Sequence, residues 1–414
     1  MYFARRALEF PGILFVERYF YPEGWSGAQI PQDIVAMLQK HWQVQVICSS
    51  RPYVPPDSND TFNPESLGVR IFWLPEPLDA QGHVGEAMGQ LAFSLLAALM
   101  ALVRFRPRLM VVLTNPPPMV VLMACVATIL RVPLLIVAMD LYPEVLFSRY
   151  PRLRSVPLFG VLTGVYGWAY RSAARVVSLD SSASEVLRGK GVHSSRIVRI
   201  NNWATGDLAI HRRPANHLAT PWGIGRELVL LYSGNLGEAH EWETLLASVE
   251  RVHRDPCRFK CVFAARGSRL VSARSFVLER QLEGCVAFQD LVPAHLLPHA
   301  FGLADLGVVT LREGFDGLVV PSKLAGFLAR GIPVLYIGPE TELSRLLVAH
   351  GAGIRFAPGD VLGVSSLLEQ LIDNPHQLSS CREAARLLYA DQFSSQVGLQ
   401  RYLKLAQELI PAPS

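Results

Sequence analysis

The 414-residue chain is roughly two to three times the length of a usual domain of about 150 residues, and half of it is apolar, so two domains with separate cores are expected. Residues 1–204 carry 19 Lys and Arg against 14 Asp and Glu, so this half holds the positive excess of a chain whose net charge is +4. That excess is too small and too scattered for a nucleic-acid-binding protein, and it fits an anionic lipid surface or a phosphorylated acceptor better.

Short apolar runs alternate with segments of helical periodicity along the first half, which predicts a largely parallel sheet covered on both faces. Strands are expected at residues 12–17, 44–48, 69–74, 109–113, 134–138, 176–179 and 198–200, and helices at residues 27–39, 85–103, 119–130, 156–169 and 183–190. Residues 1–204 are therefore expected to form an N-terminal Rossmann-like domain. Residues 205–225 lack apolar periodicity and are expected to be a linker.

The same alternation returns in residues 226–390, which predicts a second Rossmann-like domain. Residues 391–414 are expected to form a C-terminal helix that can cross back to the first domain. Within residues 226–414, strands are expected at 228–232, 260–264, 286–288, 306–310 and 333–337, and helices at 241–253, 271–283, 295–304, 322–329, 340–350, 361–372 and in a pair over 377–409.

Two apolar stretches of the first half are shorter than a membrane span. Residues 91–103 and 119–130 both fall below the roughly 20 residues that a transmembrane helix needs, so buried helices are favoured. The alternative for residues 91–103 is a helix that lies on a membrane, because Arg104, Arg106 and Arg108 follow it at once.

A glycine turn opens the second half. The apolar run from Leu228 to Tyr232 ends in Ser233-Gly234-Asn235, and helical spacing follows. A strand that passes through such a turn into a helix leaves backbone N–H groups pointing outward, which predicts a site for a phosphate or diphosphate. Because this turn comes after a complete α/β half, it suggests a sugar-nucleotide enzyme that works in an interdomain cleft.

No metal site is expected. The six cysteines lack zinc-type spacing and are interpreted as reduced thiols of a cytosolic protein. Two histidines stand four residues apart, at 295 and 299, but Pro298 interrupts the pattern and no third ligand is evident.

Several blocks together resemble the family-4 glycosyltransferases of the GT-B fold, most of all those that build bacterial exopolysaccharide and colanic-acid-like polymers. The blocks span essentially the whole chain: Phe20-Tyr-Pro-Glu-Gly24 with Gly27, Thr114-Asn-Pro-Pro-Pro118, Asp140-Leu-Tyr-Pro-Glu144, Asn201-Asn-Trp203, Tyr232-Ser-Gly-Asn-Leu-Gly237, Ala304-Asp305, and Val320-Pro-Ser-Lys323 with Gly331-Ile-Pro333. The resemblance implies two doubly wound parallel-sheet domains facing across a cleft. It also implies a retaining hexosyltransferase that uses no cofactor.

The resemblance and the strand-end positions of these blocks predict the site residues, because ligands of open parallel sheets bind beyond the carboxyl ends of the strands. The expected catalytic residues are Asp140, Lys323 and Glu313; donor binding is expected from Gly234, Asn235, Arg266, Gly267, Ser322 and Lys323; the acceptor-side loop is expected to contain Glu23, Gly27 and Glu144. A GT-B enzyme usually neutralises its leaving diphosphate with Lys or Arg and a helix N-terminus.

Lys323 is the first candidate cation, because the first turn of a helix is where a lysine is least expected for stability; a solvated lysine is the alternative. Arg266 is the second. Asp140 stands where many family members have a histidine, and its carboxylate could orient or deprotonate an acceptor hydroxyl. The alternatives for Asp140 are a helix cap or a loop hydrogen bond, and Glu144 could also be a cap.

The chain departs from the family pattern in one respect. Many members carry two glutamates eight positions apart, but here the second position falls on Gly326 counted from Gly331, or on Pro321 counted from Glu313. The ribose contact is then expected from backbone groups or Ser322. The basic residue that usually follows the glycine turn is also absent, since Glu238, Ala239 and His240 stand there.

Three functions remain open from the sequence. The first is transfer of a sugar from a nucleotide-diphosphate sugar to a saccharide acceptor linked to polyprenyl diphosphate, in the cytoplasm or at the cytoplasmic face of the inner membrane. The second is a sugar-nucleotide epimerase of the same fold, which would need more His, Asp and Glu in these blocks. The third is a catalytically silent GT-B scaffold in a polysaccharide assembly complex, motivated by the missing second glutamate.

Overall fold

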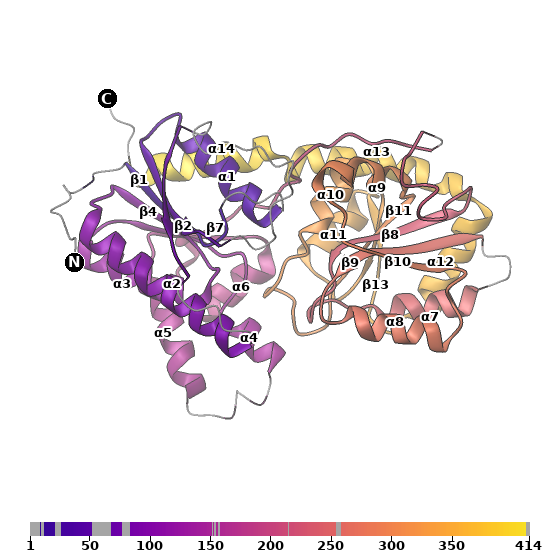
Figure 1. The fold of residues 1–414 in the computed structure, drawn as a ribbon, viewed down its shortest axis with the longest axis horizontal. Coiled ribbons are helices and arrows are strands. Elements are labelled where there is room, and N and C mark those ends of the chain that lie inside the picture. The colour runs from indigo at the N-terminus through magenta and orange to yellow at the C-terminus, as the bar shows by residue number, and fades with distance from the viewer. Residues whose placement is uncertain are drawn as a thin grey trace. The chain divides into compact units, whose positions relative to one another are not determined.

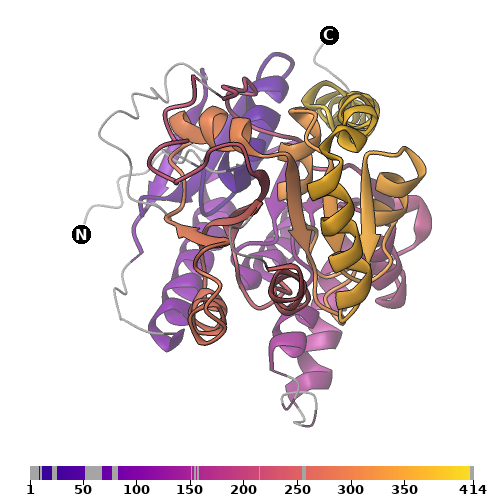
Figure 2. The same ribbon diagram turned by 90° about the vertical axis from the view of Figure 1, so that its right-hand side faces the viewer.

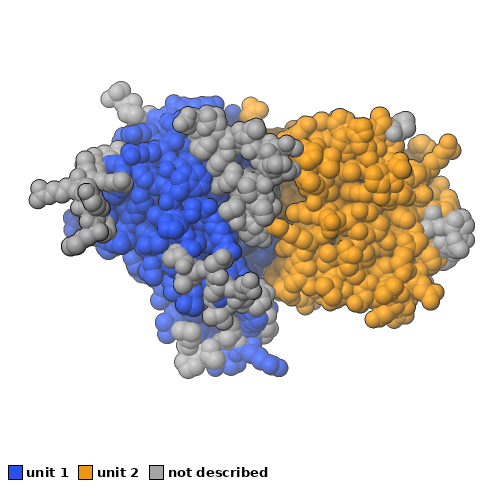
Figure 3. All heavy atoms as spheres, viewed as in Figure 1, with its two compact units in different colours: residues 1–201, 317–320, 398–414 blue, residues 202–316, 321–397 orange. Residues whose placement is uncertain are grey.

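A computed structural model describes residues 9, 12–20, 26–51, 68–76, 83–150, 152, 155, 158–213, 215–253 and 258–410 (Figure 1). The chain divides into two compact units, drawn in blue and orange in Figure 3. Unit 1 contains Met1–Asn201, Gly317–Val320 and Gly398–Ser414, and unit 2 contains Asn202–Asp316 and Pro321–Val397.

Unit 1 is built on a seven-stranded, all-parallel sheet with the order β3-β2-β1-β4-β5-β6-β7. Its strands are β1 (Ile13–Val16), β2 (Val44–Ser49), β3 (Arg70–Leu74), β4 (Leu109–Leu113), β5 (Leu134–Val137), β6 (Arg175–Ser178) and β7 (Ile197–Arg199). Its helices are α1 (Ser26–Leu38), α2 (His83–Arg104), α3 (Pro117–Leu130), α4 (Glu144–Arg149), α5 (Leu158–Ser172) and α6 (Ser181–Gly189).

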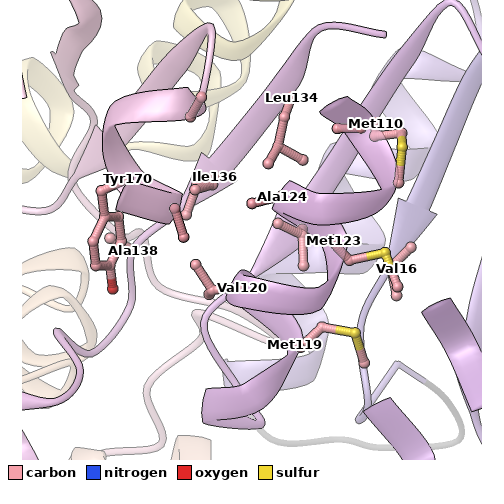
Figure 4. Packing of buried hydrophobic residues seen from close by; sticks show 14 of the residues in the cluster. Val16, Met110, Met119, Val120, Met123, Ala124, Leu134, Ile136, Ala138 and Tyr170 are labelled. Carbon is pink, nitrogen blue, oxygen red and sulfur yellow. The ribbon is translucent and has the colours of Figure 1, made fainter. Parts of the chain in front are cut away.

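The order of the strands reverses between β1 and β4, which is the usual place for a ligand crevice in a doubly wound sheet. Right-handed crossovers place α2, α3 and α5 on one face of this sheet and α1 on the other, as Figure 1 shows. Met119, Val120 and Met123 of α3 pack against strand residues such as Met110 and Ile136 (Figure 4). This packing covers the middle of the sheet, so the strand ends are left to carry polar groups.

Unit 2 has a six-stranded parallel sheet with the order β10-β9-β8-β11-β12-β13, flanked by helices on both faces (Figures 1 and 2). Its strands are β8 (Leu228–Asn235), β9 (Phe259–Arg266), β10 (Val286–Gln289), β11 (Leu306–Thr310), β12 (Val334–Ile337) and β13 (Gly353–Phe356). The helices are α7 (Glu243–Val252), α8 (Leu270–Glu279), α9 (Leu297–Leu303), α10 (Lys323–Ala329), α11 (Glu342–Ala349), α12 (Val361–Asp373) and α13 (Leu378–Leu388). The last helix, α14 (Ser395–Leu409), starts in unit 2 and belongs to unit 1 from Gly398 on. Two doubly wound parallel-sheet domains confirm the predicted fold class.

Two differences from the sequence expectations have simple causes. The edge strand β13 was not predicted, because Gly353-Ile-Arg-Phe356 is short and only half-buried, and its assignment depends on pairing with β12. The expectation of reduced thiols holds for Cys48, Cys125, Cys261 and Cys381, which are free. It is wrong for Cys285, which takes part in a disulfide bond.

Candidate functional site

The strand order of unit 2 reverses between β8 and β11, and the predicted donor residues gather at the carboxyl ends of these strands and of β9. The turn after β8 is joined to both neighbours. Leu236 N donates to Arg266 O at 2.6 Å, Arg269 N donates to Leu236 O at 3.1 Å, and Arg312 N donates to Ala239 O at 2.8 Å. Three strand ends therefore hold one turn in place, as expected at the ligand crevice of such a sheet.

Lys323 begins α10, and its ammonium lies over this turn. Lys323 Nζ donates to Asn235 O at 3.0 Å and lies 3.3 Å from His240 Nε2. The ammonium also stands 4.7 Å from the centre of the Tyr232 ring, which is a cation–π distance. Packing against the sheet positions α10, because the Phe327 ring of α10 occupies the space that a side chain at Gly307 of β11 would fill.

The neutral form of His240 matches this arrangement. Burial, and then the positive charge of Lys323, lower the pKa of His240 to about 3. His240 Nδ1 lies 3.0 Å from Thr310 O, so the single ring proton is assigned to Nδ1 and donated to that carbonyl. Nε2 then presents a lone pair to Lys323, and the ammonium keeps one of its three protons for a ligand.

Burial also lowers the pKa of Lys323 to about 7. The contacts around its ammonium come from a carbonyl, a neutral imidazole and an aromatic face, and none of the described residues forms an ion pair with it. A half-buried lysine held by neutral groups gains most from an anionic ligand, because the ligand would supply the missing counter-charge. This is the strongest indication of an anion site in unit 2.

Two glycines at the ends of β8 and β9 allow close contact with Lys323 and with Leu236. Gly234 has φ +119°, and a Cβ there would lie 3.1 Å from Lys323 Cε. Gly267 has φ +134°, and a Cβ there would lie 2.4 Å from Leu236 O. L-residues with side chains rarely adopt these backbone angles, so both positions require glycine.

Substituting Gly267 by alanine is expected to lower the free energy of unfolding of unit 2 by about 2–4 kcal/mol, because the clash is with backbone atoms and the φ angle is strained. Gly351→Ala is the matched control, since Gly351 has φ +66° with no atom within 4 Å of the added Cβ and should cost only about 1 kcal/mol. Urea denaturation of the three proteins checks this. Equal losses in both variants would show that the close approach at Gly267 contributes nothing.

The helix expected at residues 241–253 is present as α7, but its N-terminus does not adjoin Asn235, where the phosphate site was expected. α7 begins at Glu243, eight residues after Asn235. Glu241 caps it, accepting hydrogen bonds from Thr244 N at 2.6 Å and Thr244 Oγ1 at 2.8 Å. Because this carboxylate accepts the Thr244 N–H and places a negative charge at the start of α7, that helix end is unfavourable for a diphosphate.

The other predicted donor residues lie at the same strand ends. Arg266 is the last residue of β9 and is half-buried, paired in register with Asn235. Ser322 is the N-cap residue of α10, is exposed, and makes no cap hydrogen bond through its side chain. Glu313 lies in the exposed turn after β11, three residues beyond Thr310.

In unit 1, Asp140 stands beyond β5, and the loop after β4 holds it. Thr114 Oγ1 accepts hydrogen bonds from Met139 N and Asp140 N, both at 3.1 Å. Asp140 also forms an isolated bridge with Val319, in the 317–320 segment of the same unit. Burial raises the pKa of the Asp140 carboxyl to about 6, and none of the described residues donates a hydrogen bond to it. A carboxyl of this pKa titrates close to neutral pH, as a general base requires.

Glu144 has a structural partner. At the start of α4 its Oε1 accepts a short hydrogen bond from Lys190 Nζ, and the ammonium lies 5.7 Å from the centre of the Tyr170 ring. Lys190 is only 4% exposed, so this ion pair fastens the loop after β5 to the core of unit 1. Of the other predicted loop residues, Gly27 lies in the first turn of α1, and Glu23 falls outside the described residues.

Sequence reasoning assigned no site role to Tyr232 or His240, and it included Thr114 only as the first residue of a strand-end loop. Tyr232 looked like a core residue and is fully buried, yet its ring faces an ammonium. The contacts of these residues cannot be predicted from their spacing in the sequence, because they form only where the ends of different strands come together. Among the described residues, no group of three or more His, Cys, Asp or Glu has the arrangement of a metal site.

Comparisons with known proteins find similarity to glycosyltransferases. Residues 27–203 match the profile of the glycosyl transferase 4-like domain. The chain is 25% identical over 276 residues to WbjE of Pseudomonas aeruginosa, which is named as a glycosyltransferase, covering 66% of this chain and 67% of that protein. It is 26% identical over 204 residues to WcaI of Escherichia coli, which is named as a colanic acid biosynthesis glycosyl transferase, covering 47% and 49%. The chain thus spans about half the length of WcaI.

The fold matches solved structures over nearly the whole chain. The crystal structure of Anabaena HepE in complex with UDP-glucose superposes with a TM-score of 0.71 at 15% identity, over 96% of this chain and 100% of that one. Both parallel sheets are included in this match, which identifies the architecture as GT-B. The chain therefore has the GT-B fold, and its residues 27–203 match the glycosyl transferase 4-like domain, as expected for a glycosyltransferase.

Proposed function

We propose that the protein is a retaining glycosyltransferase of bacterial polysaccharide biosynthesis. It moves a sugar from a nucleotide-diphosphate sugar to a saccharide acceptor linked to polyprenyl diphosphate, at the cytoplasmic face of the inner membrane. The names of WbjE and WcaI and the UDP-glucose complex of HepE support this choice of reaction and donor class. The single observation that carries the proposal is the Lys323 ammonium, which lies on the glycine turn among neutral groups.

In the proposed reaction the bond between the anomeric carbon and the β-phosphate oxygen breaks, and negative charge builds on the leaving nucleoside diphosphate. Lys323 neutralises that charge, Arg266 adds a second cation, and the backbone of Gly234, Asn235 and Gly267 allows close approach of the donor. We assign Glu313 to the donor sugar and Ser322 to the ribose. Asp140 orients the acceptor hydroxyl and takes its proton as the new glycosidic bond forms.

The test is turnover by purified protein with a panel of nucleotide sugars and a polyprenyl-diphosphate disaccharide acceptor. Release of the nucleoside diphosphate, together with a product whose anomeric configuration by NMR equals that of the donor, is the expected result. An inverted product would overturn the retaining assignment. Binding of nucleotide sugars with no turnover on any acceptor would favour the catalytically silent scaffold, which the missing second glutamate at Gly326 or Pro321 motivates.

Transfer is expected to persist in EDTA. The proposed neutralising groups are Lys323 and Arg266, and the sequence holds no Asp-x-Asp pair of the kind that would place a divalent ion beside a diphosphate. Initial rates with and without EDTA check this, and a known metal-dependent transferase serves as the positive control for chelation. Complete loss of activity in EDTA, with rescue by magnesium or manganese, would contradict this assignment of charge neutralisation.

A further inference from the structure

The helices α2, α3 and α5 of unit 1 present a continuous apolar surface on the side away from their sheet. α3 packs against both α2 and α5. α2 exposes a ladder of five apolar side chains, each between 46% and 56% exposed: Met88, Leu91, Leu95, Leu99 and Val103. Steps of three or four residues place them on one side of the helix. Ile129 of α3 and Val161, Val165 and Trp168 of α5 add to the surface.

This surface differs from the rest of the chain in both charge and exposure. Together the three helices have 51 residues, and only Glu86, Arg104 and Arg171 among them are charged. They nevertheless supply nine of the eighteen large apolar side chains that are exposed among the described residues. Exposed apolar residues scattered singly need no explanation, but a concentration of this kind indicates an interaction surface.

The charge around this surface is mostly positive, and Glu86 in the first turn of α2 is the one acidic residue of the three helices. Between residues 87 and 179 the sequence has nine arginines, no lysine, and two acidic residues, both of them in the 139–144 loop. Arginines lie at or after the carboxyl ends of all three helices: Arg106 and Arg108 after α2, Arg131 after α3, and Arg171 in the last turn of α5. Arg175, the first residue of β6, already pairs with Glu408 at 3.7 Å. Because these helices all run antiparallel to the strands, their carboxyl ends share one edge of unit 1, and the arginines form a rim there.

α2 is packed against unit 1 along its length and is not a separate membrane-crossing helix. Among the described residues it is the one helix long and apolar enough to cross a membrane, over Gly85–Arg104 with mean hydropathy 1.7. Its inner side, however, is part of the core, since Phe93, Ala97 and Ala101 are fully buried against the sheet. Because the inner side of α2 is buried in the core, only its outer side can contact a partner. A helix that lies in a membrane interface has this geometry.

We propose that this face of unit 1, here called the α2–α3–α5 face, docks onto an anionic lipid bilayer. The ladder of α2 enters the interface between headgroups and acyl chains, Trp168 sits at the headgroup level, and the arginine rim contacts lipid phosphates. A second copy of the chain would also cover the apolar ladder, but its three helices would bring only one carboxylate, that of Glu86, to the arginine rim. Charge complementarity therefore favours lipid.

The inference deepens the proposed function, since a polyprenyl-linked acceptor is presented at a bilayer. The amino-terminal ends of α2, α3 and α5 follow the carboxyl ends of the strands, so the face begins at the edge of the sheet that carries Thr114 and Asp140. An acceptor held by its lipid would reach that edge first. The vesicle assay below contains neither donor nor acceptor, so its failure is distinguishable from failure of glycosyl transfer.

The test is cosedimentation of the full chain with vesicles of phosphatidylcholine containing phosphatidylglycerol. Leu95→Gln with Leu99→Gln removes two exposed ladder residues and is expected to weaken partitioning at least about tenfold. The matched control is Val271→Gln with Leu278→Gln on α8, where the side chains are 72% and 68% exposed but lie outside this face, and it should bind like the wild type. Arg131→Gln should weaken binding about fivefold on anionic vesicles and not on pure phosphatidylcholine.

A second measurement avoids changing the face. Cys125 is an exposed thiol of α3 on this surface, so an environment-sensitive dye attached to it in a Cys381→Ser background should shift to the blue on addition of anionic vesicles. An unshifted dye, or equal vesicle binding by the ladder variant and the α8 control, would overturn the proposal. So would a dimer in light scattering that the ladder variant dissociates while vesicles leave it unbound, since the occupant is then a second copy.

Discussion

Replacing Lys323 by alanine is expected to slow glycosyl transfer by roughly 30- to 1000-fold, because a charge-assisted contact to the leaving diphosphate contributes about 2–4 kcal/mol in the transition state. The variant should remain folded, since Lys323 begins α10 and fills no core position. Initial rates at saturating acceptor, with circular dichroism as the fold check, measure the effect. Lys260→Ala is the matched control, because Lys260 also donates to a backbone carbonyl of unit 2, Gly284 O at 2.9 Å, but belongs to neither site.

The pH dependence of donor binding separates this role from a surface lysine. The pKa of Lys323 is lowered to about 7, so its ammonium is present below that pH and lost as the pH rises through it. Affinity for a nucleoside diphosphate should therefore fall above about pH 7 in the wild type, and this fall should disappear in Lys323→Ala. Calorimetric titrations across this range check it. Near-normal turnover in a folded Lys323→Ala protein would remove Lys323 from the mechanism.

The predictable part of this protein is the part that local pattern determines. Buried parallel strands are continuous apolar runs, so residues 109–113 and 306–310 were expected as strands and coincide with β4 and β11. The glycine turn was placed slightly too early, because Ser233-Gly234-Asn235 extends β8 in register with β9 and the turn follows at residues 236–240. The family resemblance then predicted two doubly wound domains of the GT-B fold, which the two sheets and the fold match confirm.

The missed part is set by contacts between segments distant in the sequence. His240 lies near the position where the family usually has a basic residue, so the sequence suggested that a cationic contact was missing there. In the structure its contact with Thr310 O makes His240 a neutral acceptor for the ammonium of Lys323. Glu241 looked like an ordinary helix residue, yet it closes the end of α7 that was expected to bind phosphate. Tertiary packing decides both cases, because the same residue types after a turn could equally face solvent.

Replacing Asp140 by asparagine is expected to lower transfer at least about 100-fold while leaving donor affinity nearly unchanged. Asparagine keeps the shape of the side chain and removes its charge and basicity. Burial raises the pKa of Asp140 to about 6, so the wild-type rate should fall as the pH drops through that value and the carboxylate takes up a proton. That acid limb of the pH profile should be absent from the residual activity of Asp140→Asn. Steady-state kcat and KM from about pH 5 to 8 measure both effects.

The Glu144→Gln variant distinguishes a catalytic role of Asp140 from a structural role in the 139–144 loop. The Glu144 carboxylate pairs with Lys190, which is only 4% exposed, so the variant leaves a buried ammonium without its partner and should lower Tm. Transfer by the protein that remains folded should keep the acid limb near pH 6. If Asp140→Asn instead loses nucleotide binding and Tm in parallel with Glu144→Gln, Asp140 holds the 139–144 loop in place and acts on no substrate. The two substitutions thus distinguish a group that touches the acceptor from one that only positions its loop.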